Sequence, residues 1–260
     1  LNVRMIRIVG GGEPLMRFDL TLSLMKLTKK LGMSGILTTN GTLFTHTSIR
    51  EIVKIGWEKI EFSLDGPTPE INDYLRQMKG SFKKTIRNIK LFTSYKKKFK
   101  TEYPKLFFST VVTNRNYDKI EEFMKLAASI GVECVSLLEL IPKTPESKNL
   151  ELNEIQYRAV RKELLRLKKK EKIFGVRLGC EGFLHSRHFV SQKQEEKIET
   201  THKNQFLNLY CYEPWYYMQI IYDGRVGPCC STFPSEKEEN INNYTLKQLW
   251  MGKHLSQVRN

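Results

Sequence analysis

The sequence predicts an α/β fold in which parallel strands form one sheet or barrel. Short apolar runs rich in β-branched and aromatic residues alternate with longer segments of helical periodicity. A helix-like segment follows each of the first four strand-like runs, and such crossovers join parallel strands. Several of the runs end in glycine, proline or polar residues. Ligands of parallel α/β proteins bind at such carboxyl ends of strands.

The elements follow one another in a regular order. Strands are predicted over residues 3–9, 34–39, 59–64, 105–112 and 134–140. Helices are predicted over residues 18–31, 46–56, 81–98, 117–130 and 152–170. A linker that contains Pro142 and Pro145 separates the fifth strand from the last of these helices.

Size and charge limit the classes of protein that fit. The 260 residues, 40% of them hydrophobic, suffice for a sizeable core in one large domain or in one domain plus a small module. The net charge of +15 fits an anionic partner such as nucleic acid, or a lysine-rich composition with no binding role. The basic runs at 96–100 and 168–172 end predicted helices, where positive charge suits the helix dipole. No apolar run reaches the roughly 20 residues of a membrane span, so we expect no membrane association.

The first strand ends in the sequence GGGEP, residues 10–14. Glycines permit close backbone approach and unusual backbone dihedral angles, and they expose N–H and C=O groups to a ligand. The carboxylate of Glu13 beside them can hold an ammonium group, so the stretch suits the head group of an amino acid. It lacks the patterns of phosphate-binding loops. A tight strand-to-helix turn with Pro14 at the helix start would also explain it.

Two further strand ends carry polar residues. Asn40-Gly41 could be only a left-handed turn. Ser63 and Asp65 alternate along a strand, so both can face one side and contact a ribose or an amino-acid head group. An Asx-turn before Gly66-Pro67 is the alternative for Asp65. Several polar strand ends on one sheet edge favour a small-molecule pocket.

Four blocks of sequence resemble the radical S-adenosylmethionine (SAM) superfamily, and in particular its members with a C-terminal SPASM module. These blocks are GGGEPLM, TTNGTL, the segment that begins SLDGPTPEINDYLRQMKGSF, and the segment that begins VVTNRNYDKIEEFM. The resemblance runs from Val3 to Arg259, with residues 171–205 unmatched. It implies a TIM-barrel-like partial (β/α)6 barrel that lacks its first strand, plus a small SPASM-like module. The implied domains are 1–150 for the barrel, 151–205 for a helical or irregular linker region, and 206–260 for the module.

The resemblance also implies which residues bind SAM. The methionine amino group would be held by Gly11, Gly12, Glu13 and Pro14. Asn40 lies at the end of the next strand, Ser63 and Asp65 would face the ribose and the methionine carboxylate, and Val112 and Leu140 lie where the family packs adenine. Arg76 and the run KGSF, residues 79–82, match a recurring segment to which we assign no role.

The last fifth of the chain contains three cysteines in a pattern of its own. Cys211 precedes a predicted hairpin with Asp223-Gly224 at its turn, and Cys229 and Cys230 follow it. Thiolates gathered in this way suit zinc or an iron–sulfur cluster, and buried thiols are the alternative. The stretch resembles the SPASM pattern, which implies that these three cysteines bind an auxiliary [4Fe–4S] cluster, together with a cysteine beyond residue 260.

Other possible site residues have weaker patterns. Cys180 with His185 and His188 has the spacing of a zinc half-site. Cys134 begins a strand and is expected in the core. The aromatic residues 215–217 could stack on a substrate, although an aromatic cluster around the hairpin explains them as well.

The family's catalytic [4Fe–4S] cluster is bound by a C-x-x-x-C-x-x-C motif, which is not found in these 260 residues. We therefore expect a piece of a longer protein, truncated at both ends and inactive alone. By resemblance, the whole protein is a radical SAM oxidoreductase. It would cleave SAM reductively to a 5′-deoxyadenosyl radical and abstract hydrogen from a peptide or protein substrate.

Several alternatives and partners go with this prediction. The chain could instead be a degenerate, non-catalytic SAM-binding or partner module, or a basic RNA-modifying factor. We see no RNA-recognition module and do not expect nucleic acid as a partner. The resemblance implies an electron donor such as flavodoxin or ferredoxin. Iron–sulfur chemistry needs reducing surroundings, which predicts a cytoplasmic location.

Overall fold

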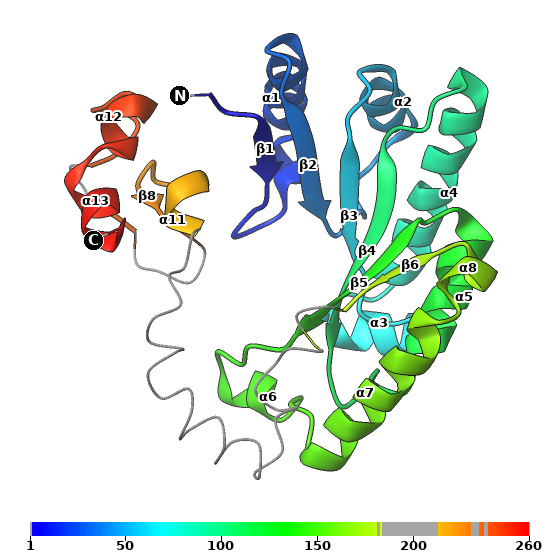
Figure 1. Ribbon diagram of the computed structural model, residues 1–260. Coiled ribbons are helices and arrows are strands. Elements are labelled where there is room, and N and C mark those ends of the chain that lie inside the picture. The colour runs from blue at the N-terminus through cyan, green and yellow to red at the C-terminus, as the bar shows by residue number, and fades with distance from the viewer. Residues whose placement is uncertain (1, 181–182, 184–212, 230–233, 237–238, 260) are drawn as a thin grey trace. The chain divides into compact units, whose positions relative to one another are not determined.

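The computed structural model describes residues 2–180, 183, 213–229, 234–236 and 239–259. The chain divides into two compact units, Val3–Val190 and Ser191–Asn260, the latter grouped with the first two residues. We describe each unit by itself (Figure 1).

A six-stranded parallel sheet forms the centre of the first unit, counted over the described residues. Its spatial order is the chain order: β1 (Met5–Ile8), β2 (Ser34–Thr39), β3 (Lys59–Ser63), β4 (Lys105–Val112), β5 (Cys134–Glu139) and β6 (Arg177–Gly179). The predicted α/β class with one parallel sheet is confirmed. Strand β6 was not predicted, because three residues are too few to show a period-2 pattern.

Helices connect these strands. They are the 3-10 helix η1 (Pro14–Arg17), α1 (Phe18–Lys30), α2 (His46–Lys54), α3 (Pro69–Leu75), α4 (Ser81–Phe99), α5 (Ile120–Ile130), α6 (Pro145–Lys148), α7 (Glu154–Lys168) and α8 (Glu171–Phe174). The predicted helices 18–31, 46–56, 81–98, 117–130 and 152–170 are all found, with small shifts at their ends. No helix within the described residues is both long and apolar enough to cross a membrane.

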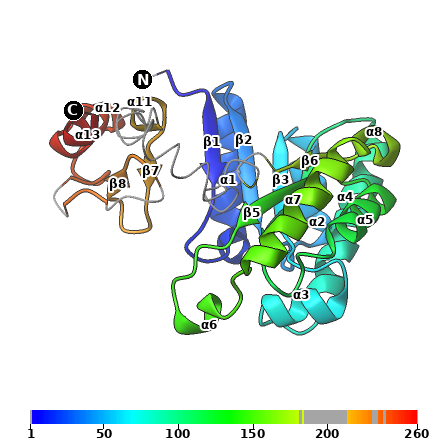
Figure 2. The same cartoon turned by 60° about the horizontal axis from the view of Figure 1, so that its bottom comes forward.

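The two faces of the sheet differ in character, as β4 shows. Leu106, Phe108 and Val112 are buried, whereas the intervening Phe107 and Ser109 are half-buried. The buried set belongs to the main hydrophobic core, and Figures 1 and 2 show α2, α4 and α5 along that side. We call the helix-covered face, which carries Leu106 and Phe108, the outer face. The other face, which carries Phe107 and Ser109, is the inner face.

The second unit contains a short hairpin. Strand β7 (Gln219–Ile220) pairs antiparallel with β8 (Val226–Gly227), and Gly224 turns the chain with φ of +88°. The hairpin predicted around Asp223-Gly224 is therefore confirmed. The helices described in this unit are α11 (Glu213–Tyr216), α12 (Leu246–Trp250) and α13 (Lys253–Arg259). Arg259 links them, because its Nε donates to the Pro214 carbonyl at 2.8 Å and its guanidinium lies 4.1 Å from the Trp250 ring centre.

Candidate functional site

A cavity of about 320 Å³ lies within the first unit, at the carboxyl ends of β1, β2 and β3. Its lining residues are Val9, Gly10, Gly12, Glu13, Thr38, Thr39, Asn40, Ser63 and Arg76. Its size falls at the lower end of the range of roughly 300–1,000 Å³ that is typical of small-molecule sites. A smaller cavity of about 60 Å³ shares Asn40, Ser63 and Arg76 with it. Polar strand ends thus do gather at one edge of the sheet.

The glycine loop after β1 forms one wall of this cavity. A Cβ on Gly10 would lie 2.6 Å from the carbonyl oxygen of Gly12, so the tight path of the loop excludes a side chain there. A Cβ on Gly11 or Gly12 would meet no described atom within 4 Å. None of the three has a positive φ. The glycines therefore provide close approach and exposed backbone, without a left-handed backbone conformation at any of the three positions.

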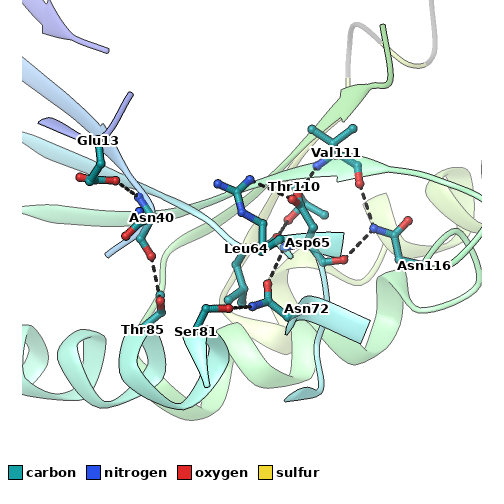
Figure 3. A network of polar contacts seen from close by, with 11 residues as sticks. Glu13, Asn40, Leu64, Asp65, Asn72, Ser81, Thr85, Thr110, Val111 and Asn116 are labelled. Atoms are coloured by element: carbon teal, nitrogen blue, oxygen red, sulfur yellow. Dashed lines mark hydrogen bonds and ion pairs between the residues drawn. The ribbon is translucent and has the colours of Figure 1, made fainter. Parts of the chain in front are cut away.

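Glu13 joins this loop to the end of β2. Its Oε1 accepts hydrogen bonds from the Leu15 amide at 3.1 Å and the Thr39 hydroxyl at 2.6 Å. Its Oε2 accepts one from the Asn40 amide at 2.8 Å, which Figure 3 shows. Glu13 caps the 3-10 helix that begins at Pro14, so the predicted helix start is present as well. Since a carboxylate has about four acceptor positions, one remains for a ligand.

Helix α4 fixes the turn that follows β2. The Thr85 hydroxyl donates to the Asn40 carbonyl and the Asn88 side-chain amide donates to the Gly41 carbonyl, each at 2.8 Å. Gly41 has φ of +72°, which confirms the left-handed turn predicted for Asn40-Gly41. Thr85 and Asn88 are fully buried polar residues, and these bonds satisfy them.

Ser63 and Asp65 have different surroundings although they lie two residues apart. Ser63 lines both cavities, whereas Asp65 is only 6% exposed and is not among the lining residues. The Asp65 carboxylate accepts hydrogen bonds from Arg76 Nη1 at 3.0 Å and from the Val111 amide at 2.8 Å (Figure 3). No described hydrogen bond forms the Asx-turn at Asp65, and Asp65 is not among the residues that line the two cavities. It positions Arg76 and holds β4.

Arg76 is a candidate binding residue to which the sequence analysis assigned no role. Its guanidinium is held by Asp65 on one side, and the residue lines both cavities. Among the described residues that line the larger cavity, it is the one that is cationic. A neighbouring network supports this arrangement: Asn72 accepts from the Asp65 amide at 3.0 Å and donates to the Ser81 hydroxyl at 2.9 Å.

Two other predicted SAM contacts lie away from the cavity. Val112 is 2% exposed and belongs to the hydrophobic core of the outer face. Leu140 follows the end of β5 and is half-buried. Neither is among the residues that line the two cavities. Val111, the neighbour of Val112, is the residue of this pair that occupies the inner face.

The cysteines are only partly described. Cys229 lies two residues after β8 and is half-buried, whereas Cys211 and Cys230 fall outside the described residues. Among the residues that are described, no three His, Cys, Asp or Glu side chains form a metal-binding group. Cys134 is buried at the start of β5, as predicted. Cys180 lies in the hydrophobic core, and its predicted zinc partners His185 and His188 are outside the described residues.

Similarity to known proteins was found at the level of family and of fold. The family model for the radical SAM superfamily matches residues 6–148, and that for the SPASM iron–sulfur cluster-binding domain matches residues 211–260. An AdoMet-dependent heme synthase of Methanosarcina barkeri is 25% identical over 248 residues, which are 94% of this chain and 68% of that protein. Two further curated relatives are each 30% identical to this chain, and the matched segments make up only 33% and 41% of their lengths.

Two solved structures have a similar fold. Streptococcus suis SuiB bound to precursor peptide SuiA has a TM-score of 0.70 at 17% identity, covering 98% of this chain and 56% of that one. AnSMEcpe with bound AdoMet and a Kp18Cys peptide has a TM-score of 0.66 at 19% identity, and the match covers 98% of this chain and 68% of that one. The chain thus spans between about half and two thirds of these proteins. It belongs to the radical SAM superfamily and carries an iron–sulfur cluster-binding SPASM domain, two families whose cofactors are SAM and [4Fe–4S] clusters.

Proposed function

We propose that the larger cavity binds the methionine part of SAM. The observation that carries this proposal is the pairing of opposite charges on its walls, Glu13 from the β1 loop and Arg76 beyond β3. Glu13 retains one acceptor position for the methionine ammonium group. Arg76, oriented by Asp65, offers its remaining N–H groups to the methionine carboxylate. The exposed backbone of Gly11 and Gly12 lets the ligand approach closely.

The residues that line the cavity fit this group. A zwitterion needs one anion, one cation and exposed backbone polar groups, and the cavity has all three. Because Thr39, Asn40, Thr85 and Asn88 hold the walls by hydrogen bonds, the site is formed without the ligand. Asp65 contributes indirectly by keeping Arg76 in place.

The reaction that we propose is hydrogen abstraction from a substrate carbon by a radical SAM oxidoreductase. A reduced [4Fe–4S] cluster, when bound to the whole protein, supplies the electron that cleaves SAM to methionine and a 5′-deoxyadenosyl radical. The residues of this chain hold SAM in one orientation and shield it from water. We propose Cys211, Cys229 and Cys230 as ligands of the auxiliary cluster, since the β7–β8 hairpin folds the chain back between Cys211 and the Cys229-Cys230 pair.

For the substrate we favour a peptide or protein. Two proteins of similar fold were solved with peptides, SuiB with its precursor SuiA and anSMEcpe with Kp18Cys. We also propose an electron donor of the flavodoxin or ferredoxin type. The reducing surroundings that such chemistry requires favour a cytoplasmic location.

A second candidate substrate is a tetrapyrrole. The heme synthase relative aligns with 94% of this chain, and an Fe-coproporphyrin III synthase of the same organism is 37% identical over 82 residues. A peptide and a tetrapyrrole differ enough in chemistry to be separated by direct assay.

The test uses the full-length protein, reconstituted without oxygen with iron and sulfide. We expect about eight irons per chain, four for each of two clusters. We also expect uptake of SAM by calorimetry and release of 5′-deoxyadenosine after reduction. A loaded protein that takes up no SAM would refute the proposed site. One that binds SAM without releasing the nucleoside would identify a non-catalytic SAM-binding module instead.

A further inference from the structure

Three serines lie side by side on the inner face of the sheet. Strand pairing sets Ser63 beside Ser109 and Ser109 beside Ser136, on β3, β4 and β5. All three are half-buried, and within the described residues none of their hydroxyls makes a side-chain hydrogen bond. Since Ser63 also lines the larger cavity, this serine row begins at the proposed SAM site and leads away from it across the sheet.

Charged side chains occupy the inner face next to the serine row. The Glu61 carboxylate accepts hydrogen bonds from Arg7 at 2.6 Å and from the Thr38 hydroxyl at 2.9 Å. It also forms an ion pair with the Lys59 ammonium at 2.9 Å. Burial raises the pKa of Glu61, but the hydrogen bond from Lys59 and the charges of Arg7 and Lys59 hold that pKa below its ordinary value. The carboxylate is therefore ionised at neutral pH, and three neighbouring groups contact it.

Arg177 differs from these residues because no described acid pairs with it. It stands on β6 in the same register row as Phe107, with Cys134 between them. Its guanidinium carbon lies 5.2 Å from the centre of the Phe107 ring, and the Lys59 ammonium lies 4.8 Å from the same ring. Arg177 is exposed, and no described carboxylate lies within ion-pair distance of it. Among the described strand residues of this face, four cations (Arg7, Lys59, Lys105 and Arg177) accompany one carboxylate, Glu61, and Lys105 pairs with Glu102 just before β4.

We propose that Arg177 binds a carboxylate of the substrate on the inner face of the sheet. This inference rests on the proposed function and specifies the substrate as one that carries carboxylates. The planar guanidinium matches a carboxylate in a two-bond geometry, and the Phe107 ring holds its orientation. The unused hydroxyls of Ser109 and Ser136 lie between this anchor and the SAM cavity, where they can hydrogen-bond the rest of the substrate.

The carboxylate can come from an acidic peptide or from the propionates of a porphyrin, and the experiment has one arm for each. Binding to the full-length, cluster-loaded protein is measured with coproporphyrin III and with its tetramethyl ester. It is measured in parallel with a glutamate-rich peptide and with the same peptide in which every glutamate is glutamine. We expect one acidic probe to bind at least about tenfold more tightly than its neutral counterpart.

Three variants connect this preference to Arg177. Arg177→Gln should lose about tenfold in affinity for the acidic probe, and Arg177→Lys should keep part of it because the charge remains. Arg50→Gln, on the exposed side of α2, is the matched control and should bind as the wild type does. The proposal is overturned if neither acid binds, if the neutral forms bind equally well, or if Arg177→Gln binds like the wild type. Release of 5′-deoxyadenosine by the wild type tests the proposed function separately.

Discussion

On β4, Leu106 and Phe108 lie on the outer face and are fully buried, whereas the alternating Phe107 and Ser109 lie half-buried on the inner face. The outer side chains pack against helices and hold the sheet together. The inner ones include charged groups and hydroxyls that no packing requirement explains. Parallel sheets are usually apolar on both faces. The outer face therefore stabilises the fold, whereas the inner face carries the polar groups on which the proposed ligand contacts depend.

The largest effect expected from breaking the outer face follows Phe62→Ala. Phe62 is fully buried, its ring centre lies about 6 Å from those of Phe44 and Phe92, and it also packs against Gly41. We expect the free energy of unfolding to fall by about 3–5 kcal/mol, as measured by denaturant titration. Ser109→Ala on the inner face is the control and should change it by less than about 0.5 kcal/mol. Equal losses from the two variants would contradict the contrast between the faces.

Glu13→Gln tests the ligand side of the comparison. The change keeps the shape but removes the charge and replaces one acceptor oxygen with a donor. We expect the affinity for SAM, measured by calorimetry, to fall by about 1.5–3 kcal/mol. Asp19→Asn, on the exposed side of α1, removes a charge nearby and should leave affinity unchanged. An unaltered affinity in Glu13→Gln would remove Glu13 from the site.

Asp65→Asn should affect both properties. It weakens the contacts to Arg76 and to the Val111 amide in a buried place, so we expect a loss of about 1–3 kcal/mol in unfolding free energy. Affinity for SAM should fall too, because Arg76 loses its support. When Asp65→Asn is added to the Arg76→Gln variant, the affinity for SAM should therefore fall little further. Strictly additive losses in the double variant would show that Asp65 acts independently of Arg76.

The smallest expected effect concerns Glu61 and pH. Since its pKa in the folded protein lies below the ordinary value of 4.5, Glu61 stabilises the fold above that pH and ceases to do so as pH falls. At neutral pH, Glu61→Gln should cost about 1 kcal/mol, because its partner Arg7 is half exposed. The difference from the wild type should shrink below about pH 4.5. A difference that stays constant down to pH 3 would contradict the assignment.

Much of the fold could be predicted because its strands follow clear patterns. Strands β2 and β4 have the predicted bounds, residues 34–39 and 105–112. Helix α3 was not predicted, since it starts at Pro69 inside a stretch whose glycine and prolines indicate a turn. Strand β6 was not predicted because it has only three residues. The position of Arg177 on the inner face could therefore not be predicted either.

The site was predicted less completely, because side-chain partners depend on distant parts of the chain. Glu13, Asn40 and Ser63 do line one cavity. The role of Asp65 depends on Arg76, eleven residues later, and no local pattern connects the two. The position of Val112 could have been predicted from the alternation of side chains along a strand. Val112 lies an even number of residues from Leu106 and Phe108, so it shares the outer face with these apolar residues.

The hydrogen bonds from Thr85 and Asn88 to the turn after β2 have a consequence for the kinetics of ligand uptake. A wall anchored to a 19-residue helix does not need to become ordered when the ligand arrives. Little conformational entropy is then lost on association, and more of the interaction energy is retained as affinity. Loosening this anchor, as in Thr85→Val, should therefore slow association more than it speeds release.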